Sequence, residues 1–224
     1  MSFQTIINDA TNISIDVNPI TSAVMSRSNR LKTATRGPAI YRFDVNVAKA
    51  YKWTGANRAL LQTLQTKGRT TEEEITLSST TGMGYIMGYA GTVSSQLSNL
   101  TIDSFTGDKI VMDTASTTGI QASDIIFEVG DYVQPANSRY TYQVRQRVTG
   151  ADISLGLIDV FMNRNIFPST SDGGNNIVNQ SVNVANNCSF HVKCLDLPAH
   201  TLVPGQLFTF DGNFTFRPEG GQSV

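Results

Sequence analysis

The chain has 224 residues, a formal net charge of −1 and two cysteines. This length accommodates one large β domain, or a core domain with an insertion, without a disulfide framework. The near-neutral charge argues against direct nucleic-acid recognition, which needs a basic patch, and no apolar run approaches the ~20 residues of a membrane helix. Charged residues make up only 16% of the chain, against about 25% on average. This composition suits a polar surface that neighbouring molecules cover, a protein that works outside a cell, or an ordinary β-rich protein with long polar loops.

The first 38 residues predict an extended N-terminal arm (1–38). Ile13, Ile15 and Val17 alternate with polar residues, which predicts a short strand that ends at Asn18-Pro19. Residues 21–38 are polar. A basic cluster in this segment is either a solvated stretch or a surface that docks on an acidic neighbour, and for the segment as a whole we favour docking. Its members are Arg27, Arg30, Lys32 and Arg36.

Residues 39–91 and 177–217 are expected to form a discontinuous core. Alternation over 41–47 predicts a two-faced strand. Leu60 and Leu64 recur at helical spacing, and Gly68 suits a helix end, so the sequence predicts one short helix over about 54–68. A return strand follows over 72–77. It opens with an acidic edge, Glu72, Glu73 and Glu74, whose charges discourage edge pairing.

Residues 92–165 predict an inserted small β-barrel. The apolar run 85–93 contains two glycines, which suggests a bulged strand or a crossing into this second unit. Turn signals then separate short strands at the spacing expected of a barrel or sandwich. The expected strands are 100–102, 109–112, 125–128, 132–134, 139–148 and 157–161.

The remaining chain returns to the core. Residues 166–176 form a loop by composition and include Asp172, and strands are expected over 177–184, 189–195 and 206–217. The last of these places four phenylalanines on one face, which is typical of a core strand. Residues 218–224 are polar and expected to be loose. Together these elements predict a mainly β protein, a β-dominated α+β fold with an antiparallel barrel or sandwich.

One stretch carries a resemblance to a known group of proteins. An apolar strand is followed by GDYVQP at 130–135, an aromatic-rich strand ending in Arg-Val, and a short apolar strand. Together with its flanks, over residues 25 to 217, this order resembles the distal tail, tail-tube-like and baseplate proteins of tailed bacteriophages. In those proteins a strand-and-helix barrel carries an inserted small β-domain. The resemblance implies ring assembly with sixfold or threefold symmetry.

Candidate chemistry is sparse. The C-x2-H-x2-C-x5-H spacing contains four zinc-type ligands: Cys188, His191, Cys194 and His200. Alternation along a strand would point His191 away from the two cysteines, so buried free cysteines are the better interpretation and we expect no cofactor. A second group, Asp124, Glu128 and Asp131, has the residue types of an acid–base pair or a cation site, but such residues more often serve as caps and turns. No nucleophile motif accompanies them, so we expect no enzyme.

Two functions remain. The first is a virion structural protein of a bacteriophage tail, a baseplate or distal-tail ring subunit that assembles with copies of itself and with other tail proteins. Its expected contacts are the basic arm, the 72–74 edge and the 166–176 loop with Asp172. Residues 1–12 lack the parts of a secretory signal, which fits synthesis in the host cytoplasm and a final place in the virion tail, with no membrane partner. The alternative is a carbohydrate-binding β-domain used in host recognition, with Tyr132, Tyr140 and Tyr142 exposed as a platform.

Overall fold

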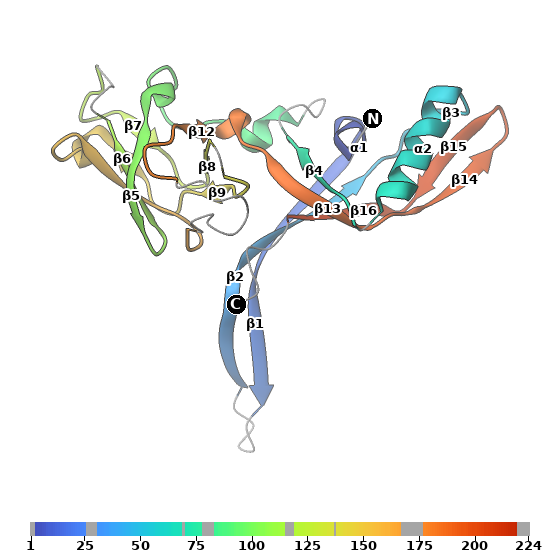
Figure 1. Cartoon of the computed structure of the whole chain (residues 1–224), viewed down its shortest axis with the longest axis horizontal. Helices are drawn as coiled ribbons and strands as arrows, with labels where there is room; N and C mark the ends of the chain where they lie inside the picture. Colours follow the sequence, from blue (N-terminus) through green and yellow to red (C-terminus); the bar gives the residue numbers. More distant parts are fainter. Residues whose placement is uncertain are drawn as a thin grey trace. The chain divides into compact units, whose positions relative to one another are not determined.

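The computed structural model describes residues 3–25, 31–68, 70–77, 83–114, 119–136, 138–166 and 177–218, with the backbone alone over 18–24 and 31–40. The chain divides into two compact units (Figure 1). The first comprises Met1–Ile75 with His191–Val224, and the second comprises Thr76–Phe190. The second unit is longer at both ends than the insertion expected at 92–165. The mainly β class is confirmed, but no sheet among the described residues closes into a barrel.

A five-stranded sheet organises the first unit. Its order is β1-β2-β16-β13-β4, and the pairs β1–β2, β2–β16 and β16–β13 are antiparallel. The strand predicted over 41–47 forms the end of β2, apart from its last residue, and buries Tyr41, Phe43 and Val45. The strands span Asn12–Met25 (β1), Leu31–Asn46 (β2), Glu72–Ile75 (β4), Phe190–Asp196 (β13) and Asn213–Pro218 (β16).

A smaller sheet and the predicted helix complete this unit. The sheet has the order β14-β15-β3, with bounds Ala199–Val203, Leu207–Asp211 and Tyr51–Lys52. Helix α2 (Gly55–Lys67) begins after Thr54, whose side chain accepts a hydrogen bond from the Asn57 N–H. It buries its leucine stripe and ends at Gly68, whose N–H donates to the Leu64 carbonyl. The helix prediction is therefore confirmed at both ends.

The phenylalanine stripe connects the two sheets. Phe208, Phe210, Phe214 and Phe216 are all buried, as predicted, and successive rings lie 4.8–6.2 Å apart. The single strand expected over 206–217 is nevertheless two strands, β15 and β16. Gly212 separates them at φ 120°, a conformation that only glycine adopts without strain. The chain therefore turns from one sheet into the other while the same aromatic face stays in the core.

The N-terminus contains a helix that the sequence pattern does not predict. Helix α1 (Phe3–Asn8) has six residues, too few to show a convincing helical period. Phe3, Ile6 and Ile7 are fully buried, and the Phe3 ring lies 5.3 Å from Phe216. Tertiary burial therefore holds this helix in place, and the first 38 residues are not simply an extended arm.

The second unit contains three small antiparallel sheets. Their orders are β11-β6-β5, β12-β8-β9 and β10-β7. They surround one continuous apolar core. The strand bounds are Thr101–Thr106 (β5), Lys109–Asp113 (β6), Ile125–Phe127 (β7), Tyr132–Pro135 (β8), Tyr142–Gln143 (β9), Val148–Thr149 (β10), Leu157–Phe161 (β11) and Val182–Val184 (β12).

Three strand predictions in this region need correction. Residues 85–93 form a 3₁₀ helix (Gly84–Met87) followed by irregular chain, because the segment has no strand partner among the described residues. The continuous strand expected over 139–148 is interrupted between β9 and β10, which pair with different neighbours. The strand expected over 177–184 is shortened to β12, which pairs with β8 of the same unit.

Candidate functional site

The most distinctive feature of the first unit is a two-stranded ribbon. β1 pairs with β2 from Asn12–Asn46 out to Met25–Leu31, whereas β16 accompanies β2 only over Phe43–Asn46. Beyond that point, among the described residues, the two strands pair only with each other (Figure 1). At about 3.4 Å per residue, the part from Val17 to Met25 extends roughly 30 Å.

The ribbon corrects the expectation that the first strand ends at Asn18-Pro19. β1 continues to Met25, and its register with β2 shifts between Pro19 and Thr21. Because proline has no N–H to donate, a bulge at this point lets the ladder resume on the far side. The described parts of the segment predicted as a polar extended arm, 21–25 and 31–38, therefore lie in paired strands.

The ribbon carries the basic cluster. Residues 17–40 contain four basic residues and no Asp or Glu. Lys32 and Arg36 lie on β2, where only the backbone is described, and Arg27 and Arg30 lie outside the described residues. The loop at 168–176 with Asp172 also lies outside the described residues. The charge of the ribbon thus follows from sequence, and its strand pairing follows from the structure.

The acidic edge lies on β4, the last strand of the five-stranded sheet. Two of its three carboxylates are engaged within the unit. Glu72 Oε1 lies 3.4 Å from His191 Nδ1. Glu73 Oε2 accepts hydrogen bonds from Lys67 Nζ at 2.9 Å and from the backbone N–H of Phe3 at 3.0 Å. Glu74 is exposed. Only Glu74 therefore presents a fully exposed charge at this edge.

The four zinc-type ligands have other partners. Cys188 Sγ donates to the Asn183 carbonyl, and burial raises the pKa of the Cys188 thiol. Cys194 is buried, with its Sγ 3.2 Å from the Asp196 carbonyl oxygen. The His200 ring packs edge-on against Phe208. Within the part of the chain that the structure describes, no three His, Cys, Asp or Glu side chains are arranged to hold a metal ion.

The acidic trio serves local structure. Asp124 Oδ2 accepts from the Gln121 N–H, and Glu128 pairs with Arg147, which lowers the pKa of Glu128. Asp131 is buried and accepts from the N–H groups of Glu128 and Ala90 at 2.8 and 2.9 Å; burial raises its pKa. The Asp124 contact closes a turn before β7, and the Asp131 contact with Glu128 closes the turn that follows β7. They correspond to the cap and turn roles weighed in the sequence.

The tyrosines do not form an exposed platform. Tyr132, Tyr140 and Tyr142 are 4%, 5% and 0% exposed. Arg164, itself buried, lies over the rings of Tyr140 and Tyr142. A glycan that stacks on these three rings would need the core of the second unit to open.

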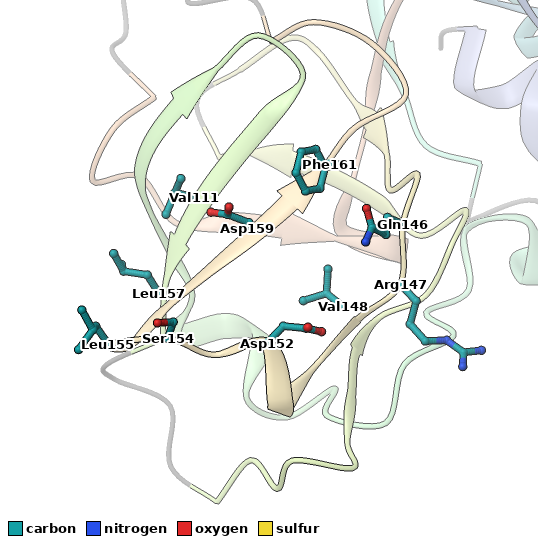
Figure 2. A pocket seen from close by; sticks show the side chains of 10 residues that line it. All are labelled: Val111, Gln146, Arg147, Val148, Asp152, Ser154, Leu155, Leu157, Asp159 and Phe161. Atoms are coloured by element: carbon teal, nitrogen blue, oxygen red, sulfur yellow. The ribbon is translucent and has the colours of Figure 1, made fainter.

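The second unit has a surface hollow of about 450 Å³ beside the turn between the 3₁₀ segment 150–152 and β11 (Figure 2). Val111, Leu157 and Phe161 line it from the outer face of the β6–β11 pair. Leu155 stands at its margin and is 100% exposed. Asp159, also on β11, pairs with Lys109 Nζ at 2.9 Å.

The sequence analysis does not single out this hollow. An available signal is Ser154-Leu155-Gly156, in which a large apolar residue occupies a tight turn between polar neighbours. Turn positions of this kind usually carry Asn, Asp or Gly. The anomaly is visible in the sequence, but its position beside an apolar sheet face becomes visible only in three dimensions.

In comparisons with known proteins, no family model and no curated protein sequence matches the chain.

Neither helix in the described residues has the length and apolar character that crossing a membrane requires.

Proposed function

We propose that this protein is a structural subunit of a bacteriophage tail, a baseplate or distal-tail ring component, that acts by assembly rather than by catalysis. The observation that carries the proposal is the β1–β2 ribbon. An isolated two-stranded ribbon is only marginally stable in water, and its outer edges offer unpaired backbone groups to another chain. Contact with a neighbouring subunit supplies the support that the unit itself does not provide.

The assembly mechanism in this proposal is a heterologous contact. The ribbon, which has no counterpart of the same shape among the other described elements of one copy, meets a different surface on the next copy. Such contacts generate a ring when their rotation closes. The spacing resemblance described above supports a place in the virion tail, with other tail or baseplate proteins as further partners and no cofactor.

A shortened ribbon tests the proposal. Residues 19–39 are replaced by Asn-Gly, a pair that favours a two-residue hairpin turn, which joins Asn18 to Ile40, a directly paired position. The wild type is expected to form oligomers in sedimentation velocity as concentration rises. The shortened variant should keep its unfolding temperature and remain monomeric. Equal self-association of the two proteins would contradict the proposal.

A further inference from the structure

Leu155 occupies an unfavourable position for a leucine. Ser154 and Leu157 exchange backbone hydrogen bonds of 2.9 Å in both directions, so Leu155 and Gly156 are the two central residues of a tight turn. Their φ values are 54° and 80°. Positive φ at both positions defines a type I′ turn, which strongly favours Asn-Gly. Leucine adds backbone strain there and also leaves its whole side chain in water.

The surroundings of Leu155 offer an apolar floor with carboxylates at its rim. Val111, Leu157 and Phe161 are half-buried on the sheet face opposite the core (Figure 2). Asp152 and Asp159 are exposed in the same hollow, and Arg147, which pairs with Glu128, lies at its margin. This combination suits a partner that brings aliphatic side chains together with positive charge.

The charges of the two units are unequal. The second unit, Thr76–Phe190, contains nine Asp and Glu residues and five Lys and Arg residues, a net charge of −4. Residues 17–40, which include the outer ribbon, carry four basic residues and no acid, a net charge of +4. The same segment supplies aliphatic residues, among them Val17, Val24 and Leu31. The ribbon segment and the second unit are therefore opposite in net charge, and both the ribbon segment and the hollow contain aliphatic residues.

We infer that the hollow around Leu155 is the docking site for the β1–β2 ribbon of a second copy of this chain. The inference rests on the proposed function and adds the acceptor surface to it. Leu155 packs its exposed side chain against the incoming ribbon, and the net negative charge of the second unit attracts the net positive charge of residues 17–40. The β4 edge is the weaker acceptor, because it offers one exposed carboxylate, Glu74, whereas the hollow offers two, Asp152 and Asp159, beside an apolar floor.

Leu155→Asn separates docking from folding. Asparagine suits the type I′ turn, so the unfolding temperature should stay equal or rise. Loss of the leucine that docking would bury should weaken self-association in sedimentation velocity by about tenfold or more. Unchanged association with an unchanged or higher unfolding temperature would overturn the inference.

Charge reversal identifies the two surfaces. Asp159→Lys, and the double change Lys32→Glu with Arg36→Glu, should each abolish association, and an equimolar mixture of the two proteins should regain it. Glu74→Lys makes the same charge change on β4 and should leave association intact. If Glu74→Lys abolished association and Asp159→Lys left it intact, the contact would lie at β4 and the inference would be overturned.

Two measurements of wild-type self-association, its dependence on salt and on protein concentration, complete the test. Raising NaCl from about 50 to about 500 mM should weaken wild-type association, because the Debye length falls from above 10 Å to well below it. A wild type that stays monomeric at every concentration and salt would refute the proposed function together with the inference. Self-association that survives Leu155→Asn and Asp159→Lys would refute the inference alone.

Discussion

A buried glutamine on β8 connects the chain that follows β8 with Ser189, near the end of the second unit. Gln134 on β8 is 2% exposed. Its Nε2 donates to the Ser138 carbonyl at 2.9 Å, and its Oε1 accepts from the Ser189 N–H at 2.8 Å. Gln134→Met keeps the side-chain length but removes both interactions. Each orphaned buried group costs about 1–3 kcal/mol, so the variant should lose about 2–6 kcal/mol of unfolding free energy.

Urea unfolding followed by circular dichroism measures this loss. Gln146→Met is the matched control, because Gln146 is exposed in the same unit and its replacement should change stability by less than about 0.5 kcal/mol. An unchanged urea dependence of the unfolding free energy would show that Gln134→Met acts on stability rather than on compactness. A loss of unfolding free energy below about 0.5 kcal/mol in Gln134→Met would contradict the reasoning that the two buried hydrogen bonds of Gln134 stabilise this unit.

Two further predictions concern local geometry. Gly150→Ala would place a methyl group against the Gln121 carbonyl oxygen and should cost about 1–3 kcal/mol of unfolding free energy in thermal unfolding. Gly55→Ala has open space at the start of α2 and should stabilise the protein by up to about 1 kcal/mol. Equal effects of the two changes would contradict the packing described. Thr149 donates from its N–H and Oγ1 to Asp152 and lowers the pKa of that carboxyl. Asp152→Asn should therefore be less stable than the wild type at neutral pH. The difference should shrink as pH falls below about 4, because the carboxyl of the unfolded chain takes up a proton before the native one, whose pKa is lowered. A difference that grows on acidification would contradict this assignment.

Sequence patterns correctly predicted the helix and strands whose structure depends on residues close in sequence. The alternation at 41–47 and the cap residues around α2 specify their own structure, because burial of one face and satisfaction of helix ends depend on neighbours in sequence. The phenylalanine stripe was correctly assigned to the core for the same reason. These predictions needed no knowledge of which strands pair.

The missed elements depend on distant contacts. α1 is short and is held by the packing of Phe3 on Phe216, more than 200 residues away in sequence. The corner at Gly212 exists because two sheets share one aromatic face, which strand periodicity alone does not reveal. The polar residues of 21–38 show no alternation, so their pairing into a ribbon follows only from the strand partner.

The candidate contact residues also divide into those that the sequence identifies and those that depend on the three-dimensional structure. Charge along the sequence identified the basic segment, of which the structure places Lys32 and Arg36 on β2. The same reasoning treated Glu72 and Glu73 as exposed edge charges. In the structure Glu72 lies beside His191, and Glu73 accepts hydrogen bonds from Lys67 and from the N–H of Phe3. Leu155 escaped notice because an isolated leucine in a loop is common, and its significance depends on the turn geometry and the apolar face beside it.

Mass spectrometry of tails purified from phage particles made in cells that produce this chain tests the central claim most directly. The account predicts that the chain is present in the tail fraction in multiple copies, at a fixed ratio to the other tail proteins. Its absence from purified tails, with the chain recovered only as free protein in the lysate, would contradict the account.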